Sequence, residues 1–283
     1  TLISPAAAWR SLLIFYWEGK KEIKPEKRTG MREETKIKML DIRFNAVKQE
    51  QLLEEVFRNI EEKKMSSIMF VNVDVAIKAE KDELLKQALN ESEMVLADGM
   101  PIIWISKLFK TPLPEKISGS DFVPELCRMA AQKGKKLFLA GGGEGVAERA
   151  AENLLMKYPG IQISGWYSPP YGFENQPEEI EKMNAAIHSA GPDIVIVCLG
   201  CPKQERYVYE NRDTYKAGIS ICAGATIDFL AGNVKRCPAW MSRYGLEWFF
   251  RFLQEPKRLF KRYFIDDIQI LRMVLKYRPG KSQ

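Results

Sequence analysis

The sequence is poor in the residues that build metal and disulfide sites. It has one histidine, His188, and five cysteines, which are Cys127, Cys198, Cys201, Cys222 and Cys237. Because their number is odd and their spacing is not that of a disulfide framework, we interpret the cysteines as reduced thiols of a cytosolic protein. One CxxC is present without a second, and four zinc ligands are hard to assemble with a single histidine. We therefore expect no metal site.

Long apolar runs are also missing. A membrane-spanning helix needs about 20 mostly apolar residues, and the best candidate, residues 6–17, is short and contains Arg10. Since Met31 is a plausible second start, we treat residues 1–37 as an N-terminal extension of unknown role and leave them out of the fold prediction.

Several nucleotide-binding motifs are absent. An NAD-dependent sugar-nucleotide enzyme should show G-x-G-x-x-G after the first strand and an acidic residue about 20 residues further on, and neither fits here. The sequence also lacks a P-loop and a DxD-type metal pair. No familiar nucleic-acid motif accompanies the basic charge, so a nucleic-acid partner is not expected.

The sequence does contain an ordinary globular composition, 46% hydrophobic and 28% charged. Short apolar runs alternate with longer amphipathic stretches, which is typical of βα units and a mostly parallel sheet. Strands are predicted at residues 67–73, 94–97, 136–140, 162–166, 194–199 and 219–223, and helices at residues 81–90, 119–133, 146–157, 177–190 and 202–211. The prediction is an α/β fold with a single Rossmann-like catalytic domain over residues 38–232.

The basic charge is concentrated in a tail, residues 233–283, which we predict to be a helical appendage. Residues 235–283 hold twelve Lys or Arg against four Asp or Glu, a net of +8 within a chain whose total is +6. On helices, Arg251, Arg258 and Lys261 fall on one face, where cations can grip a diphosphate. Interleaved Trp, Phe and Tyr suit an anionic membrane surface. The alternative is a solvated basic face whose aromatic side chains pack into the core.

A glycine-rich loop, Gly141-Gly142-Gly143-Glu144-Gly145, follows one predicted strand and precedes a helix. Backbone amides at the N-terminus of a helix bind phosphate. The alternative is a turn that merely allows the strand and the helix to pack.

Polar residues follow three further strands. Asp98 comes directly after one of them in Ala97-Asp98-Gly99, Asn72 and Asp74 end another, and Lys203-Gln204-Glu205 opens a helix after a third. Open α/β sheets bind their ligands at the carboxyl ends of the strands, so these clusters predict a nucleotide crevice. Each is also typical of an ordinary turn or helix cap.

An ordered set of motifs resembles the WecG/TagA/CpsF glycosyltransferase family, and the match runs from about residue 40 to residue 265. The motifs are Ala97-Asp98-Gly99-Met100-Pro101, Glu115-Lys116-Ile117-Ser118-Gly119-Ser120-Asp121, the glycine-rich loop, Gly200-Cys201-Pro202-Lys203-Gln204-Glu205, residues 224–232, and Gly245-Leu246-Glu247-Trp248 through Glu255-Pro256-Lys257-Arg258.

The resemblance implies an N-acetylmannosaminyltransferase-like enzyme. It would transfer a sugar from a UDP-sugar donor to a polyprenyl-diphosphate-linked acceptor, with inversion and without a metal or cofactor. Members build enterobacterial common antigen, teichoic acid linkage units and exopolysaccharides. The implied location is the inner face of the bacterial cell membrane, with the tail on the membrane surface. A homo-oligomer and a non-catalytic membrane adaptor stay open as alternatives.

The resemblance also assigns roles to residues. Asp98 takes the position of the catalytic base. The expected substrate-binding residues are Asn72, Lys116, Gly141, Gly142, Gly143, Lys203, Gln204, Glu205, Asp228, Arg236, Arg251, Arg258 and Lys261. The chain departs from the family pattern at Phe70, where Thr is frequent, and at Lys116, where Arg is usual, and both departures bear on the identity of the donor sugar.

Overall fold

The computed structural model describes residues 36–238, 241, 247–254, 256–261 and 266–279. Contacts within the chain separate residues 1–34 from residues 35–283, and every described residue lies in the second unit.

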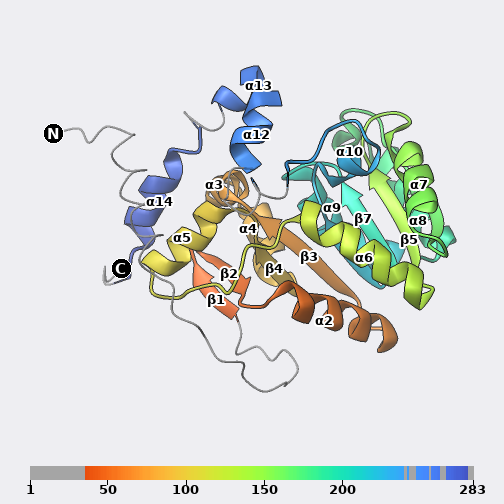
Figure 1. The fold of residues 1–283 in the computed structure, drawn as a ribbon, viewed down its shortest axis with the longest axis horizontal. Helices are drawn as coiled ribbons and strands as arrows, with labels where there is room; N and C mark the ends of the chain where they lie inside the picture. The colour runs from red at the N-terminus through yellow and green to blue at the C-terminus, as the bar shows by residue number, and fades with distance from the viewer. Residues whose placement is uncertain (1–35, 239–240, 242–246, 255, 262–265, 280–283) are drawn as a thin grey trace. The chain divides into compact units, whose positions relative to one another are not determined.

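A six-stranded parallel sheet in the order β4-β3-β8-β7-β5-β6 forms the centre of this unit (Figure 1). The strands of the unit are β1 (Lys36–Met39), β2 (Ile42–Asn45), β3 (Ser66–Val71), β4 (Met94–Ala97), β5 (Lys136–Gly141), β6 (Gln162–Tyr167), β7 (Ile194–Cys198) and β8 (Ile219–Cys222). Strands β3, β4, β7 and β8 are buried along their whole length, as expected for a parallel sheet covered on both faces. The predicted α/β, Rossmann-like fold is confirmed.

Helices cover both faces of the sheet. They are α2 (Gln49–Glu61), α3 (Val73–Lys81), α4 (Glu83–Glu91), α5 (Met100–Leu108), α6 (Gly119–Lys133), α7 (Val146–Lys157), α8 (Pro177–Ala190), α9 (Lys203–Tyr215), α10 (Thr226–Leu230), α12 (Glu247–Gln254), α13 (Pro256–Lys261) and α14 (Gln269–Tyr277), with the short 3-10 helix η2 (Phe173–Asn175). The apolar sides of α3, α4, α8 and α9 share one core with the sheet. Helices α2 and α6 cover the face turned toward the viewer in Figure 1.

Strand β3 ends earlier than predicted, and this places two polar residues outside the strand. Strand β3 stops at Val71, whereas the predicted strand ran to Val73. The side-chain oxygen of Asn72 accepts a hydrogen bond from the Val75 amide at 3.1 Å and caps α3. Asp74 therefore lies in the first turn of a helix, where a negative charge is favourable.

A hairpin that the sequence did not reveal precedes the sheet. Strands β1 and β2 pair antiparallel, with Met39 opposite Ile42, so Leu40 and Asp41 alone form the turn. Both turn residues have positive φ, 54° and 60°. Turns of this kind normally carry Asn-Gly or Asp-Gly, and because Leu40-Asp41 lacks that signal, the hairpin was not predicted.

The C-terminal helices contact the catalytic domain through α14. The Lys276 ammonium lies 2.7 Å from one Glu80 oxygen, and the Tyr277 hydroxyl donates to the other at 2.9 Å. Ile270 and Met273 of α14 are buried. Among the residues described, none of the helices has the length and apolar character of a membrane span.

Candidate active site

Asp98 and Asn72 leave neighbouring strands side by side. Strands β3 and β4 are parallel and in register, with Val71 opposite Ala97. The amide of Asp98 donates to the carbonyl of Val71 at 2.9 Å. Two polar residues that are far apart in the sequence are thus neighbours at the carboxyl edge of the sheet.

The chain turns sharply after Asp98. Gly99 has φ 109°, a conformation that favours glycine, and it caps the N-terminus of α5, with Pro101 in the first turn of the helix. Asp98 is half-buried and directly precedes Gly99, the residue at the N-terminus of this helix.

The segment before α6 adjoins the same edge. The Ile117 amide donates to the carbonyl of Ala97 at 2.9 Å, which brings Lys116 next to the β4 end of the sheet. A side chain on Gly119 would lie 3.2 Å from the Ala223 carbonyl and 3.4 Å from the Phe70 ring. Glycine at this position allows the N-terminus of α6 to approach the ends of β3 and β8 closely.

An ionic cluster forms around Asp121, which the sequence reading did not select. Lys116 contacts one of its oxygens at 2.8 Å, Ser118 donates to the same oxygen at 2.7 Å, and Arg236 pairs with the other. Burial favours the neutral carboxyl, but Lys116, Ser118 and Arg236 together hold the pKa of Asp121 below its ordinary value. Asp121 thus contacts two of the predicted substrate-binding cations. The sequence signal for Asp121 was Ser118 three residues earlier, which caps α6.

Gln204 and Glu205 are brought to the same edge but are buried. The Gln204 side-chain oxygen accepts from the Gly224 amide at 3.0 Å, and its amide nitrogen donates to Glu205 at 2.7 Å. Gln204 therefore fixes the loop that follows β8. Burial is the largest influence on Glu205 and raises the pKa of its carboxyl.

Lys78 is a second residue that sequence reasoning missed. Its ammonium lies 2.8 Å from Asp74, one helical turn earlier, and donates to the Cys201 carbonyl at 3.2 Å. It therefore ties the first turn of α3 to the loop after β7. The spacing from Asp74 to Lys78, four residues on a helix, was the only sequence signal.

The glycine-rich loop lies further along the edge and is tightly packed. The Gly142 amide donates to the Cys198 carbonyl at 3.1 Å, so it is not one of the bare amides that the sequence suggested. A side chain on Gly141, whose φ is 118°, would lie 2.2 Å from the same carbonyl oxygen. Gly143 is exposed, and the nearest atom to an added side chain would be 3.8 Å away.

Two further predicted residues lie away from Asp98 along the edge. The Lys203 ammonium pairs with Glu174 at 2.6 Å and lies over the Tyr171 ring, so it faces the loop after β6. Asp228 lies on α10, the helix that packs against α7, and accepts hydrogen bonds from Asn233. Lys203 follows β7, the neighbour of β5, and Asp228 is on the glycine-loop side because α10 packs against α7.

The predicted cations of the tail are only partly described. Arg251 lies in α12 and Arg258 in α13, and their side chains are outside the described part of the structure. Lys261 ends α13 and is exposed. Arg236, through its ion pair with Asp121, is the described tail cation at the candidate site.

Comparison with known proteins gives one family and two relatives. The sequence model of the "Glycosyl transferase WecG/TagA/CpsF family" matches residues 37–283. A protein from Bacillus subtilis strain 168 is 34% identical, and one from Bacillus spizizenii strain W23 is 32% identical. Each similarity covers 199 residues, 70% of this chain and 75% of the relative. Both relatives are named N-acetylglucosaminyldiphosphoundecaprenol N-acetyl-beta-D-mannosaminyltransferase.

Proposed function

Because the chain belongs to the WecG/TagA/CpsF family of glycosyltransferases, we propose that it transfers a sugar from a UDP-sugar to a polyprenyl-diphosphate-linked saccharide. The sugar is N-acetylmannosamine, N-acetylmannosaminuronic acid or a related hexose. The names of both relatives include a diphosphoundecaprenol acceptor and an N-acetylmannosaminyl group, which supports this choice. The product enters cell-surface polysaccharide or teichoic acid synthesis at the inner face of the membrane.

One observation carries the proposal for the site. Asp98 and Asn72 follow in-register parallel strands, and the segment with Lys116 is hydrogen-bonded to the residue before Asp98. Residues that carry a carboxyl, an amide and an ammonium group therefore have neighbouring backbones at the edge where open α/β sheets bind their ligands, which supports the proposal. The cluster of Lys116 and Arg236 around Asp121 holds two cations and one carboxylate, and its cations suit a diphosphate.

The proposed reaction is an inverting displacement that needs neither a metal nor a cofactor. The acceptor hydroxyl oxygen attacks the anomeric carbon, and its proton passes to the Asp98 carboxylate. The bond from the anomeric carbon to the UDP oxygen breaks, and UDP leaves with the electron pair. Lys116 and Arg236 stabilise the charge that develops on the leaving diphosphate.

Replacement of Asp98 tests the assignment. With a panel of UDP-sugars and a short-chain lipid-diphosphate acceptor, mass analysis of the product identifies the donor sugar. Asp98→Asn keeps the size and removes the base, so turnover should fall by roughly 10²–10⁴-fold. Asp213→Asn, at an exposed position near the end of α9, should keep normal turnover. Near-normal transfer by Asp98→Asn would show that another group accepts the proton.

The tail is proposed to hold the protein on the membrane surface. Its described helices expose Leu253 (60%) and Phe260 (54%) beside the cation Lys261. Exposed apolar side chains next to cations suit an anionic bilayer interface. Binding to anionic vesicles should therefore weaken when Leu253 and Phe260 are changed to Asn. Leu155→Asn on α7, where Leu155 is 51% exposed, is the matched control, and equal binding by both variants would contradict a membrane role for the tail.

A further inference from the structure

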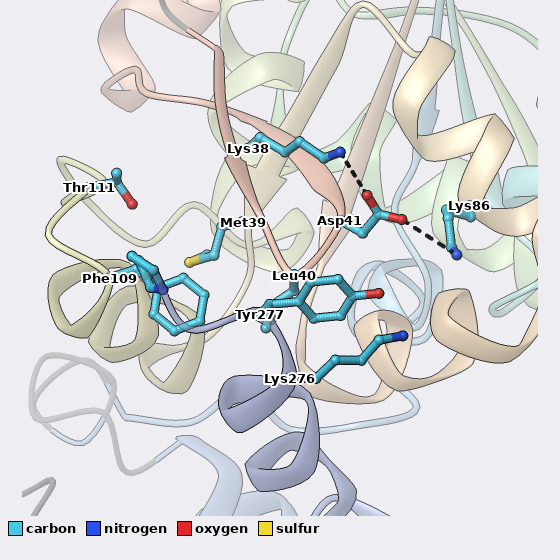
Figure 2. Close-up of a pocket in the computed structure, with 10 residues that line it drawn as sticks. Lys38, Met39, Leu40, Asp41, Lys86, Phe109, Thr111, Lys276 and Tyr277 are labelled. Atoms are coloured by element: carbon cyan, nitrogen blue, oxygen red, sulfur yellow. Dashed lines mark ion pairs between the residues drawn. The ribbon is translucent and has the colours of Figure 1, made fainter. Parts of the chain in front are cut away.

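A cavity of about 500 Å³ lies at the opposite end of α5 from Asp98 (Figure 2). The hairpin turn, α4, the end of α5 and the end of α14 supply its walls. Helix α5 has nine residues, which separate its two ends by about 13 Å. The cavity is therefore distinct from the site built around Asp98, and the proposed transfer reaction gives it no role.

Positive charge gathers at one end of the cavity. Figure 2 shows Lys38, Lys86 and Lys276 there, together with Asp41. The Lys38 ammonium contacts one Asp41 oxygen at 2.8 Å, and the Lys86 ammonium faces the other at 3.6 Å. The lining thus holds three lysines and one aspartate, and Glu80 and Glu83, which lie outside the lining, are acidic partners of Lys276 and Lys86.

Lys86 is held in the cavity without a close acceptor. Its side chain is only 19% exposed, and its nearest acidic partners are Asp41 at 3.6 Å and Glu83 at 3.5 Å. Both distances exceed those of normal N–H···O hydrogen bonds, about 2.7–3.2 Å. Because an ammonium carries three donors, Lys86 retains the capacity to bind an anionic oxygen inside the cavity.

The other end of the cavity is apolar, with one hydroxyl. Met39 and Phe109 lie there, next to Thr111 (Figure 2). The Thr111 side-chain oxygen is buried and has no hydrogen-bond partner among the described residues. A buried polar atom without a partner is uncommon in native structures. A ligand that fills the cavity would supply the missing partner.

The turn between these two ends is strained. Leu40 and Asp41 both adopt positive φ, which non-glycine residues rarely do. Leu40 is nevertheless buried, and Asp41 is fixed by its two lysines. Strained backbone that is held in place by its surroundings occurs preferentially at ligand sites.

The end of α14 completes the cationic end. Glu80 contacts both Lys276 and Tyr277 and holds them against α3. Lys276 uses one of its donors in this contact and has others for a ligand. Glu80 thus contacts Lys276, and Glu83 contacts Lys86. Asp41 contacts Lys38 and Lys86.

From these observations we propose that the cavity binds a phosphate ester. Its phosphate group contacts Lys38, Lys86 and Lys276, and its organic part lies on Met39 and Phe109 within reach of Thr111. Clustered lysines are suited to phosphate as point charges with several donors. The ester is either a soluble metabolite or the headgroup of an anionic phospholipid, since both present the same phosphate chemistry.

Inorganic phosphate is the first probe. Thermal unfolding of the full chain is followed against phosphate concentration, with saturating UDP present and with potassium chloride at equal ionic strength as the reference. Lys86→Gln should weaken phosphate binding about tenfold or more, as expected for the loss of a charged hydrogen bond. Lys64→Gln, at an exposed position after α2, should leave phosphate binding unchanged. Lys38→Gln provides a second cavity variant.

Two further probes distinguish the sources of the ester. Loss of glycerol 3-phosphate binding in Lys86→Gln would identify a soluble ligand. Loss of binding to vesicles with phosphatidylglycerol, but not to phosphatidylcholine vesicles, would identify a lipid headgroup. Equal behaviour of Lys86→Gln, Lys38→Gln and Lys64→Gln with every probe would overturn the proposal. Because UDP binding and sugar transfer are measured separately, failure here is distinguishable from failure of the proposed glycosyltransferase site.

Discussion

The loops after β3 and β4 differ from the loops after β5, β7 and β8 in how they use their polar or flexible residues. In the second group, Gly141 and Gly142 pack against Cys198, and Gln204 hydrogen-bonds to Gly224. These contacts hold the loops to one another. In the first group, the half-buried Asp98 follows the edge strand β4, and the half-buried Asn72 follows its neighbour β3. The strand ends of the first group thus carry the proposed site, whereas those of the second group pack their loops together.

The sharpest test of this difference, and the largest expected effect, is at Gly141. Gly141→Ala would place a side-chain carbon 2.2 Å from the Cys198 carbonyl oxygen at φ 118°. Overpacking and backbone strain together should lower the free energy of unfolding by about 3–5 kcal/mol. Gly143→Ala meets nothing closer than 3.8 Å and should change it by less than about 0.5 kcal/mol. Urea unfolding of both variants measures this, and equal stabilities would show that the loop is not packed as described.

A smaller effect is expected at Glu205. Burial raises the pKa of this carboxyl above its ordinary value of 4.5, and one of its oxygens has no hydrogen-bond partner among the described residues. The folded protein therefore binds the proton more tightly than the unfolded chain, and the contribution of Glu205 to stability falls as the pH rises above 4.5.

The Gln side chain of Glu205→Gln is neutral at every pH, so the stability of this variant should not fall in this way as the pH rises. At neutral pH we expect the variant to be more stable by on the order of 1 kcal/mol or more, because the wild-type protein must either bury a charge or bind a proton there. The advantage should shrink as the pH is lowered toward 4.5. Urea unfolding across a pH series measures it, and parallel profiles for the two proteins would contradict a buried acid with a raised pKa.

The smallest effect on stability is expected at Asn72, which caps α3 and is also a proposed substrate contact. Asn72→Ala removes the cap of α3 and should lower the free energy of unfolding by about 1 kcal/mol, whereas Asn72→Asp keeps a capping oxygen and should stay within a few tenths. Turnover should fall in both, because both lose the side-chain amide. Normal turnover in Asn72→Asp would mean that Asn72 serves only as a cap.

Much of the fold could be predicted from local patterns. The boundaries of α6, α7, α8 and β4 agree with the predicted ones, since their apolar periodicity and flanking Ser, Gly and Pro residues are local signals. The hairpin was missed because Leu40-Asp41 carries no turn signature, and α3 was missed because its first residues continue the apolar run of β3. In both places long-range packing decides the conformation.

The sequence by itself determined the alternation of strands and helices, the polar residues at the strand ends and the basic charge of the tail, because each depends on residue type and short spacing. Only the tertiary structure decided which strand ends are neighbours. It placed Asp98 and Asn72 after neighbouring strands, gathered Lys116 and Arg236 at Asp121, and formed a cavity between the hairpin and α14. Strand order and helix packing join residues that are distant in the chain, and no local periodicity encodes those contacts.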